Sequence, residues 1–202
     1  MQNLGKRYGA TWALRGVNLT LEAGEVLLLT GHNGSGKTTL LRLLATAVTP
    51  SAGSGTIFTH DLRQARDAIR CTTALVSHAS YLYEDLTARE NLALVGTALA
   101  RDGGAACLER VGLLARADER VRGFSAGMRK RLSLARALLK APTLLLLDEP
   151  FGELDPQGMA LVEALIAEQR EKGTTLVLST HWIEQGERLS TRRLHLERGS
   201  AR

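Results

Sequence analysis

A run of eight residues from Gly31 to Thr38 matches the phosphate-binding pattern G-x-x-x-x-G-K-[ST] at every fixed position. In such a loop the glycines let the backbone curl until successive N–H groups point at phosphate oxygens. Lys37 brings a positive charge to the terminal phosphates, and the Thr38 hydroxyl is suited to bind Mg²⁺. The run therefore predicts a site for a nucleoside triphosphate. The residues expected to hold it are Gly31, Asn33, Gly34, Ser35, Gly36, Lys37, Thr38 and Thr39.

Two acidic residues, Asp148 and Glu149, follow the apolar run 143–147. A buried strand delivers the side chains at its carboxyl end to the crevice in which α/β folds bind ligands. We expect Asp148 to hold Mg²⁺, through water, opposite Thr38. We expect Glu149 to polarise the water that attacks the γ-phosphate, because a carboxylate beside the bound nucleotide can act as a general base. Together the two motifs indicate hydrolysis of ATP rather than binding alone.

The elements that must position these motifs are predicted from the pattern of apolar residues. Runs of Leu and Val without polar alternation are typical of strands buried on both faces of a parallel sheet. The four runs of this kind are 26–30, 73–77, 143–147 and 175–179. Helical patterns cover 37–47, 88–100, 105–111 and 128–139, whereas 49–55 is predicted to be a loop. We therefore expect an α/β fold, in which helices flank the parallel sheet of a P-loop NTPase core and a helical subdomain is added.

The chain of 202 residues suits one domain, 1–202, rather than two. Within it the alternation of apolar runs and helical patterns predicts a nucleotide-binding core at about 1–80 and 141–202. The segment of about 81–140, rich in Ala, Leu, Arg and Glu, is expected to be a helical insertion into that core.

Composition excludes little beyond this. The two cysteines, Cys71 and Cys107, form no C-x-x-C pair and are predicted to be buried, reduced thiols of a cytosolic protein. We expect no signal peptide and no membrane span, since no apolar stretch reaches the roughly 20 residues that a spanning helix needs. The net charge of +5 suits a nucleic acid, an anionic membrane surface or a nucleotide equally well. Basic residues are scattered along the chain, with short runs at 129–131 and 192–193, and most of them are interpreted as part of a solvent-exposed face.

The segment 124–132, between the two nucleotide motifs, resembles the signature sequence of ATP-binding-cassette (ABC) proteins, with Ser-Ala-Gly in place of Ser-Gly-Gly. Ser125 can cap the following helix, and Gly127 leaves the backbone open, so the helix N-terminus can present N–H donors to a phosphate. Alone, the segment would suit an ordinary N-capped helix. The resemblance implies that Ser125 and Gly127 bind ATP held by a second copy of the chain, in a homodimer with ATP at its interface.

Other positions carry the resemblance over nearly the whole chain. It implies that Tyr8 stacks on adenine, although a core tyrosine is the alternative, and that His181 contacts the γ-phosphate. Asp155 matches the acid of the loop that communicates across the dimer. His78 stands where the family usually has a glutamine that contacts Mg²⁺ and the attacking water, so we expect His78 to bind metal and take part in catalysis.

Three features narrow the resemblance to the ATPase subunit of the haem exporter used in cytochrome c maturation. These are His78, the Ser-Ala-Gly form of the signature, and Phe151 directly after the acidic motif. Another small export or multidrug-type cassette is the alternative. Because only Met1 and Gln2 precede Asn3, we expect either a truncated edge strand or a start upstream; we expect no regulatory domain after Gly199.

The resemblance implies a peripheral ATPase on the cytoplasmic side of the cell membrane that energises export through separate integral-membrane subunits. Tyr81 and Tyr83 lie in a predicted mobile surface loop that would meet such a subunit, unless they pack under the helical insertion. We expect no nucleic-acid partner, since the soluble cassettes that act on nucleic acid or ribosomes usually have two cassettes, coiled-coil insertions or zinc-binding cysteines. A P-loop kinase or GTPase is disfavoured by the signature, and a non-hydrolysing module by the intact motif residues.

Overall fold

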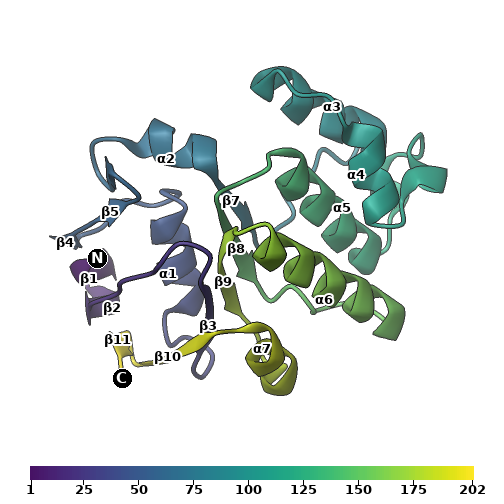
Figure 1. Ribbon diagram of the computed structural model, residues 1–202. Coiled ribbons are helices and arrows are strands. Elements are labelled where there is room, and N and C mark those ends of the chain that lie inside the picture. The colour runs from purple at the N-terminus through teal and green to yellow at the C-terminus, as the bar shows by residue number, and fades with distance from the viewer.

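The computed structural model describes residues 1–202 and is built around a six-stranded sheet of order β11-β10-β3-β9-β8-β7 (Figure 1). The strands of this sheet are β3 (Val26–Thr30), β7 (Thr73–Val76), β8 (Leu144–Asp148), β9 (Thr175–Ser179), β10 (Arg192–Glu197) and β11 (Ser200–Ala201). All neighbouring pairs from β10 to β7 are parallel, and β11 is antiparallel to β10. The predicted α/β fold with a parallel core is confirmed.

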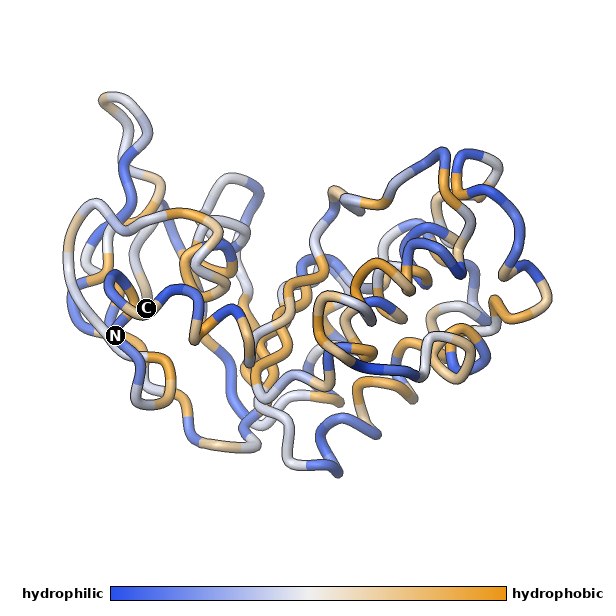
Figure 2. The backbone as a smooth tube through the Cα atoms, turned by 90° about the horizontal axis from the view of Figure 1, so that it is seen from above, coloured by the Kyte–Doolittle hydropathy of each residue, from blue (hydrophilic) through white to orange (hydrophobic).

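Successive residues of the central strands enter two separate hydrophobic cores. In β3, Leu28 belongs to one core, whereas Leu27 and Leu29 belong to the other. The second core contains the leucines of α1 (Lys37–Leu44), and the first contains apolar residues of α6 (Pro156–Glu171) and of the helices in the 88–139 part of the chain. Burial on both faces explains why these strands are runs of Leu and Val without polar alternation. In Figure 2 the strands near the middle of the molecule are accordingly coloured as hydrophobic.

A second, antiparallel sheet of order β2-β1-β4 lies against α1 and was not expected from the sequence. It consists of β1 (Gln2–Tyr8), β2 (Thr11–Val17) and β4 (Ala52–Ser54). The segment 3–8 is thus itself a strand, and the loop predicted over 49–55 is wrong at 52–54. Two short strands, β5 (Thr56–Ile57) and β6 (His60–Asp61), and α2 (Arg66–Thr72) connect this sheet to β7.

The part of the chain between β7 and β8 is helical. It contains α3 (Ala88–Leu99), α4 (Gly104–Arg110) and α5 (Ala126–Leu139), with 3₁₀ turns at Leu114–Arg116 and Val121–Gly123. These helices pack on one another at one side of the sheet (Figure 1). After β9 the chain forms α7 (Ile183–Leu189), which packs against α6 and β3. None of the helices has the length and apolar content needed to cross a membrane.

The cysteine prediction is correct for one residue and wrong for the other. Cys107 is buried in the first core, but Cys71 is exposed. In the short helix α2, Ile69 is the buried residue, and a residue two positions later points to the opposite side of a helix. The helical period therefore turns Cys71 towards solvent.

A capping box at the start of α3 stabilises the helical part of the chain, and this contribution can be tested. The Thr87 hydroxyl accepts a hydrogen bond from the Glu90 N–H at 3.1 Å, and the Glu90 carboxylate accepts one from the Thr87 N–H at 2.7 Å. Thr87→Ala removes half of this capping box and is expected to lower the free energy of unfolding by about 1 kcal/mol, or the melting temperature by about 2–4 °C. Thermal unfolding followed by circular dichroism measures the change.

Thr97→Ala is the matched control, because Thr97 is an exposed residue inside α3 whose side chain caps nothing. An equal loss of stability in both variants would contradict the importance of the cap.

Candidate functional site

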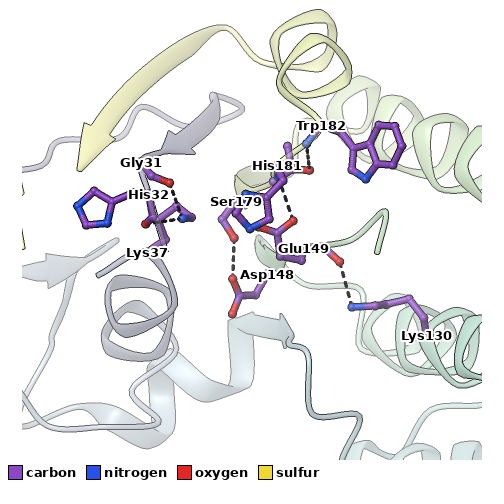
Figure 3. Close-up of polar contacts among 10 residues, drawn as sticks. Gly31, His32, Lys37, Lys130, Asp148, Glu149, Ser179, His181 and Trp182 are labelled. Atoms are coloured by element: carbon purple, nitrogen blue, oxygen red, sulfur yellow. Dashed lines mark hydrogen bonds and ion pairs between the residues drawn. The ribbon is translucent and has the colours of Figure 1, made fainter. Parts of the chain in front are cut away.

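The predicted nucleotide motifs meet at one edge of the parallel sheet. β3 ends at Thr30 and runs into the phosphate-binding loop, β8 ends at Asp148, and β9 ends at Ser179. Because these strands are parallel neighbours, their carboxyl ends lie side by side (Figure 3). Segments that are more than a hundred residues apart in the sequence thereby contribute to one site.

The phosphate-binding loop has a shape that requires glycine. Gly31 has φ of +139°, and a Cβ placed on it would lie 2.2 Å from the carbonyl oxygen of Leu196. Gly36 has φ of +109°, and its Cβ would lie 2.7 Å from the carbonyl oxygen of Ala13. Lys37 bends back over the loop and donates hydrogen bonds to Gly31 O at 2.7 Å and His32 O at 3.2 Å. The loop thus holds a nearly buried ammonium group at the start of helix α1.

A hollow of about 370 Å³ lies over this loop. It is lined by Tyr8, Ala13, Asn33, Gly34, Gly36, Lys37, Thr38, Thr39, Asp148, Glu149 and His181. Tyr8 is 47% exposed, which excludes the alternative of a core tyrosine, and the Lys6 ammonium lies 5.1 Å from its ring centre. The hollow therefore joins an exposed aromatic ring, a cation and two acids, which are the groups needed for a base, phosphates and a metal ion.

The two acids of the motif have different surroundings. Asp148 is buried, and its carboxylate accepts a hydrogen bond from the Ser179 hydroxyl at 2.6 Å. The Glu149 carboxylate accepts one from the His181 N–H at 3.1 Å, and its other oxygen lies 3.3 Å from His181 Nε2 (Figure 3). Glu149 also has φ of +51°, a left-handed conformation that is unusual for a residue other than glycine. The structure thus brings together Glu149 and His181, both predicted from the sequence.

Ser179 was missed by the sequence analysis. Its only signal was its place at the end of the apolar run 175–179, which many structural serines share. The register of β8 and β9, which pairs Asp148 with Ser179, makes the contact visible. A hydrogen bond of this kind fixes the direction in which a metal-binding carboxylate points.

Mg²⁺ has a suitable set of donors at this site. Thr38 and Asp148 line the same hollow, and together they offer a hydroxyl and a carboxylate oxygen. Nowhere in the chain do three or more His, Cys, Asp or Glu side chains gather as a metal cage. Mg²⁺ is typically bound by one or two protein oxygens together with waters and substrate phosphates, so the residues present fit this ion.

Six of the predicted site residues do not line the hollow, and five of them belong to the phosphate-binding loop, the signature segment or the start of α6. Ser35 is fully buried beneath the loop, with a hydroxyl that has no hydrogen-bond partner. Ser125 caps α5 by accepting from the Met128 N–H at 3.2 Å, and Asp155 caps α6 by accepting from the Gly158 N–H at 2.7 Å. Gly31 and Gly127 lie outside the lining as well. In the single chain Ser125 and Gly127 of the signature segment therefore lie outside the nucleotide hollow.

His78 is the sixth predicted residue outside the hollow. It lines a neighbouring cavity of about 180 Å³, together with Ser77, Ser80, Ala126, Arg129, Lys130, Ser133 and Glu153. This cavity separates α5 from the segment that follows β7. The structure thus places His78 beside the signature helix rather than beside the phosphate-binding loop.

Lys130 is an exception to the solvent-exposed position expected for most of the basic residues. Its side chain is 5% exposed, and its ammonium donates to the Glu149 main-chain carbonyl at 3.0 Å. Burial lowers the pKa of Lys130, while the charges of Glu153, Asp148 and Glu149 act in the opposite direction. Lys130 faces inward because it shares one side of α5 with the buried Ser133 and Leu134, which follow it three and four residues later.

The two tyrosines of the predicted surface loop are exposed. Tyr81 is 67% and Tyr83 is 64% exposed, so neither packs under the helical part of the chain. Arg136 of α5 donates to the main-chain carbonyls of Ser80 and Tyr81 at 2.7 and 2.6 Å. The loop therefore presents its aromatic side chains outward while its backbone is attached to α5.

Comparison with known proteins places the chain in one protein family. The sequence model of the family described as "ABC transporter" matches residues 14–152. A cytochrome c biogenesis ATP-binding export protein of Pseudomonas putida is 39% identical over 188 residues, which cover 92% of this chain and 90% of that protein. A daunorubicin resistance ATP-binding protein of Streptomyces coeruleorubidus is 38% identical over 193 residues, covering 93% of this chain.

The chain spans 61% of the length of that daunorubicin resistance protein. Among solved structures, the dimeric ATP-binding cassette determined in a post-hydrolysis state with ADP and phosphate has a TM-score of 0.92 and 27% sequence identity. The match covers 99% of this chain and 94% of the cassette.

The hydrogen bond between Ser179 and Asp148 generates a prediction about metal binding. Ser179→Ala leaves the Asp148 carboxylate without its fixed partner, and loss of such a partner typically weakens metal affinity 10–100-fold. We expect the Mg²⁺ concentration needed for half-maximal binding of a fluorescent ATP analogue to rise at least tenfold. The measurement is a Mg²⁺ titration at constant nucleotide concentration.

Thr175→Val is the control. Thr175 lies at the other end of the same strand, and its hydroxyl accepts a hydrogen bond from the Gly24 N–H that this variant removes. An unchanged Mg²⁺ requirement in Ser179→Ala would show that Asp148 does not depend on Ser179.

Proposed function

Because the chain belongs to the ABC transporter family, we propose that it is an ATP-binding and ATP-hydrolysing subunit that energises export through separate membrane subunits. The observation that carries this proposal is the shared hollow at the carboxyl edge of the sheet. It combines the phosphate-binding loop, the acids of β8 and the paired Glu149 and His181. On this basis the chain is one cassette domain, with a nucleotide-binding core at about 1–80 and 141–202 and a helical subdomain at about 81–140.

ATP binding is assigned to the loop and its neighbours. The loop N–H groups and the α1 N-terminus receive the phosphates, and Lys37 moves from the loop carbonyls to the β- and γ-phosphate oxygens. The ring of Tyr8 stacks on adenine, for which its exposure at the rim of the hollow is suitable. Thr38 and Asp148 would hold Mg²⁺, which would supply positive charge against the nucleotide phosphates.

Hydrolysis is assigned to Glu149 and His181. The Glu149 carboxylate orients a water molecule against the γ-phosphorus and accepts its proton, a contribution of about 10²–10⁴ in rate for a general base. The hydrogen bond from the His181 N–H holds one oxygen of that carboxylate in place. The His181 ring is then available to contact a γ-phosphate oxygen. His78 lines the adjacent cavity and not this hollow, so it is assigned no direct contact with the metal in the single chain.

A homodimer with ATP at its interface accounts for the residues that stand apart from the hollow. Ser125, Gly127 and Asp155 do not reach the hollow of their own chain, as expected if they complete the site of a partner. The similar cassette solved as a dimer supports this arrangement. Removal of the γ-phosphate would reopen the dimer, and this motion would drive the membrane subunits from the cytoplasmic side.

For the transport pathway we propose the haem-exporter type of cytochrome c biogenesis. His78, the Ser-Ala-Gly signature and Phe151 support it, as does the 39% identity to the Pseudomonas putida export protein. A drug-export cassette is the second candidate, since the daunorubicin resistance protein is 38% identical. We expect no contact with nucleic acid in either case.

Glu149→Gln tests the assigned general base. The amide keeps the size of the side chain but cannot accept the proton, so ATP should still bind while steady-state hydrolysis is lost. With Mg·ATP the variant should accumulate as a dimer, because the bridging γ-phosphate is retained. Phosphate release and analytical ultracentrifugation measure the two effects.

The control for this variant is Glu171→Gln, which makes the same change at the exposed end of α6. Hydrolysis by Glu149→Gln at the rate of the Glu171→Gln control would rule out Glu149 as the base.

The transport assignment is tested with tagged Glu149→Gln protein, loaded with Mg·ATP and incubated with solubilised membranes of its source. Mass spectrometry then identifies the proteins that co-purify. We expect integral-membrane proteins, among them cytochrome c maturation subunits. Membrane subunits of a drug exporter would favour the second candidate, and ribosomal or DNA-repair proteins would refute the transport role.

A further inference from the structure

The contact between Lys130 and Glu149 connects two parts of the molecule that the site otherwise leaves separate. Lys130 lies in α5, the helix that begins after Ser125, and Glu149 lies at the end of β8. Figure 3 shows the Lys130 side chain extending from its helix to the Glu149 carbonyl, with a donor–acceptor distance of 3.0 Å. A lysine that is 5% exposed and bound to a main-chain oxygen rather than to a carboxylate is unusual and requires a physical reason.

The backbone of Glu149 is held in an unfavourable conformation. Its φ of +51° is left-handed, and the following Pro150 favours an extended conformation for the residue before it. Such conformations persist only where the surroundings hold them in place. The direction of the Glu149 carboxylate therefore depends on the contacts that hold its backbone, in addition to its own hydrogen bond from the His181 N–H.

Those contacts come from three directions. The Glu149 N–H donates to Ser179 O of β9 at 3.0 Å, which fixes the peptide before it. The Glu149 carbonyl accepts from the Gly152 N–H at 3.3 Å, within the same turn, and from Lys130 at the shorter distance of 3.0 Å. The Glu149 carbonyl thus has one donor inside the turn, the Gly152 N–H, and one donor from another element, Lys130 of α5.

The surroundings of the Lys130 ammonium are polar and charged. The neighbouring cavity gives it a polar environment that contains His78 on the segment after β7, Arg129 on its own helix and Glu153 on the loop before α6. Burial lowers the pKa of Lys130, and the charges of Glu153, Asp148 and Glu149 partly offset this effect. The charged Lys130 is therefore compatible with burial between α5 and the acidic turn.

We propose that Lys130 is a positioning residue for ATP hydrolysis, whose hydrogen bond to the Glu149 carbonyl holds the Glu149 carboxylate in the nucleotide hollow. The proposal rests on the function assigned to Glu149 above. It further implies that a displacement of α5 changes the position of Glu149. The helix that presents the signature segment would thereby be connected to the general base of its own chain.

The test compares kcat and KM for ATP among purified variants. Lys130→Met keeps the length of the side chain but removes its donor and charge. It is expected to lower kcat at least tenfold with KM within about twofold, because Lys130 does not itself line the hollow that binds the nucleotide and contacts only the Glu149 carbonyl there. Lys130→Gln keeps an N–H donor and should give an intermediate kcat.

Arg131→Met is the matched control. Arg131 is the next residue of α5, and it also donates to a main-chain carbonyl, that of Val111 at 3.1 Å, but within the helical part of the chain. It should leave kcat and KM near their wild-type values. A kcat of Lys130→Met within twofold of wild type, or an equal loss in Arg131→Met, would overturn the proposal.

A second measurement separates failure of this proposal from failure of the assigned function. If Glu149→Gln hydrolyses ATP normally, the role assigned to Glu149 is wrong. The crystal structure of Lys130→Met then tests separately whether Lys130 holds Glu149 in position. We expect Glu149 to leave its left-handed conformation in that variant. A wild-type φ for Glu149 and an unmoved carboxylate would refute the positioning role whatever the activity.

Discussion

The parallel register of β3, β9 and β8 is the constraint on which the rest of the structure depends. Asp148 is paired with Ser179 and Leu29 with Ser179 across neighbouring strands, so three chain segments end at the same edge. The register is held by apolar contact on both faces, since alternate residues enter two different cores. A slip of one residue would exchange the two cores and separate the carboxylate of Asp148 from its hydroxyl partner.

The site at this edge gathers buried charges, and each is held by a specific contact. Lys37 is bound by loop carbonyls, Asp148 by Ser179, and Lys130 by the Glu149 carbonyl. Unpaired charges would be costly in a nearly buried setting, whereas hydrogen-bonded ones are tolerated. The left-handed backbone of Glu149 belongs to the same arrangement, because its carboxylate direction is maintained by neighbours from β9 and α5. Groups fixed in advance, as Asp148 and Glu149 are, need no rearrangement when charge develops during a reaction.

The strands that could be predicted from the sequence are those in which every residue is buried. β3, β8 and β9 are buried on both faces, and their Leu and Val runs follow from that burial. β10 was missed because it lacks the apolar run of a strand buried on both faces. Four of its six residues are charged or histidine, and only Leu196 is fully buried. The antiparallel strands β1 and β2 were missed for a similar reason, since their polar residues and glycines resemble a loop.

Local chemistry in the sequence determined the phosphate-binding loop, the acidic pair and the cap at Ser125, because each depends on neighbours within a few residues. Tertiary structure alone decided which distant residues support them. Ser179 reaches Asp148 only through strand register, and Lys130 reaches Glu149 only because α5 packs beside the end of β8. His78 lies in the cavity next to α5 instead of the nucleotide hollow for the same reason. A sequence specifies the groups that a short segment carries, whereas the packing of separate segments determines which group each one contacts.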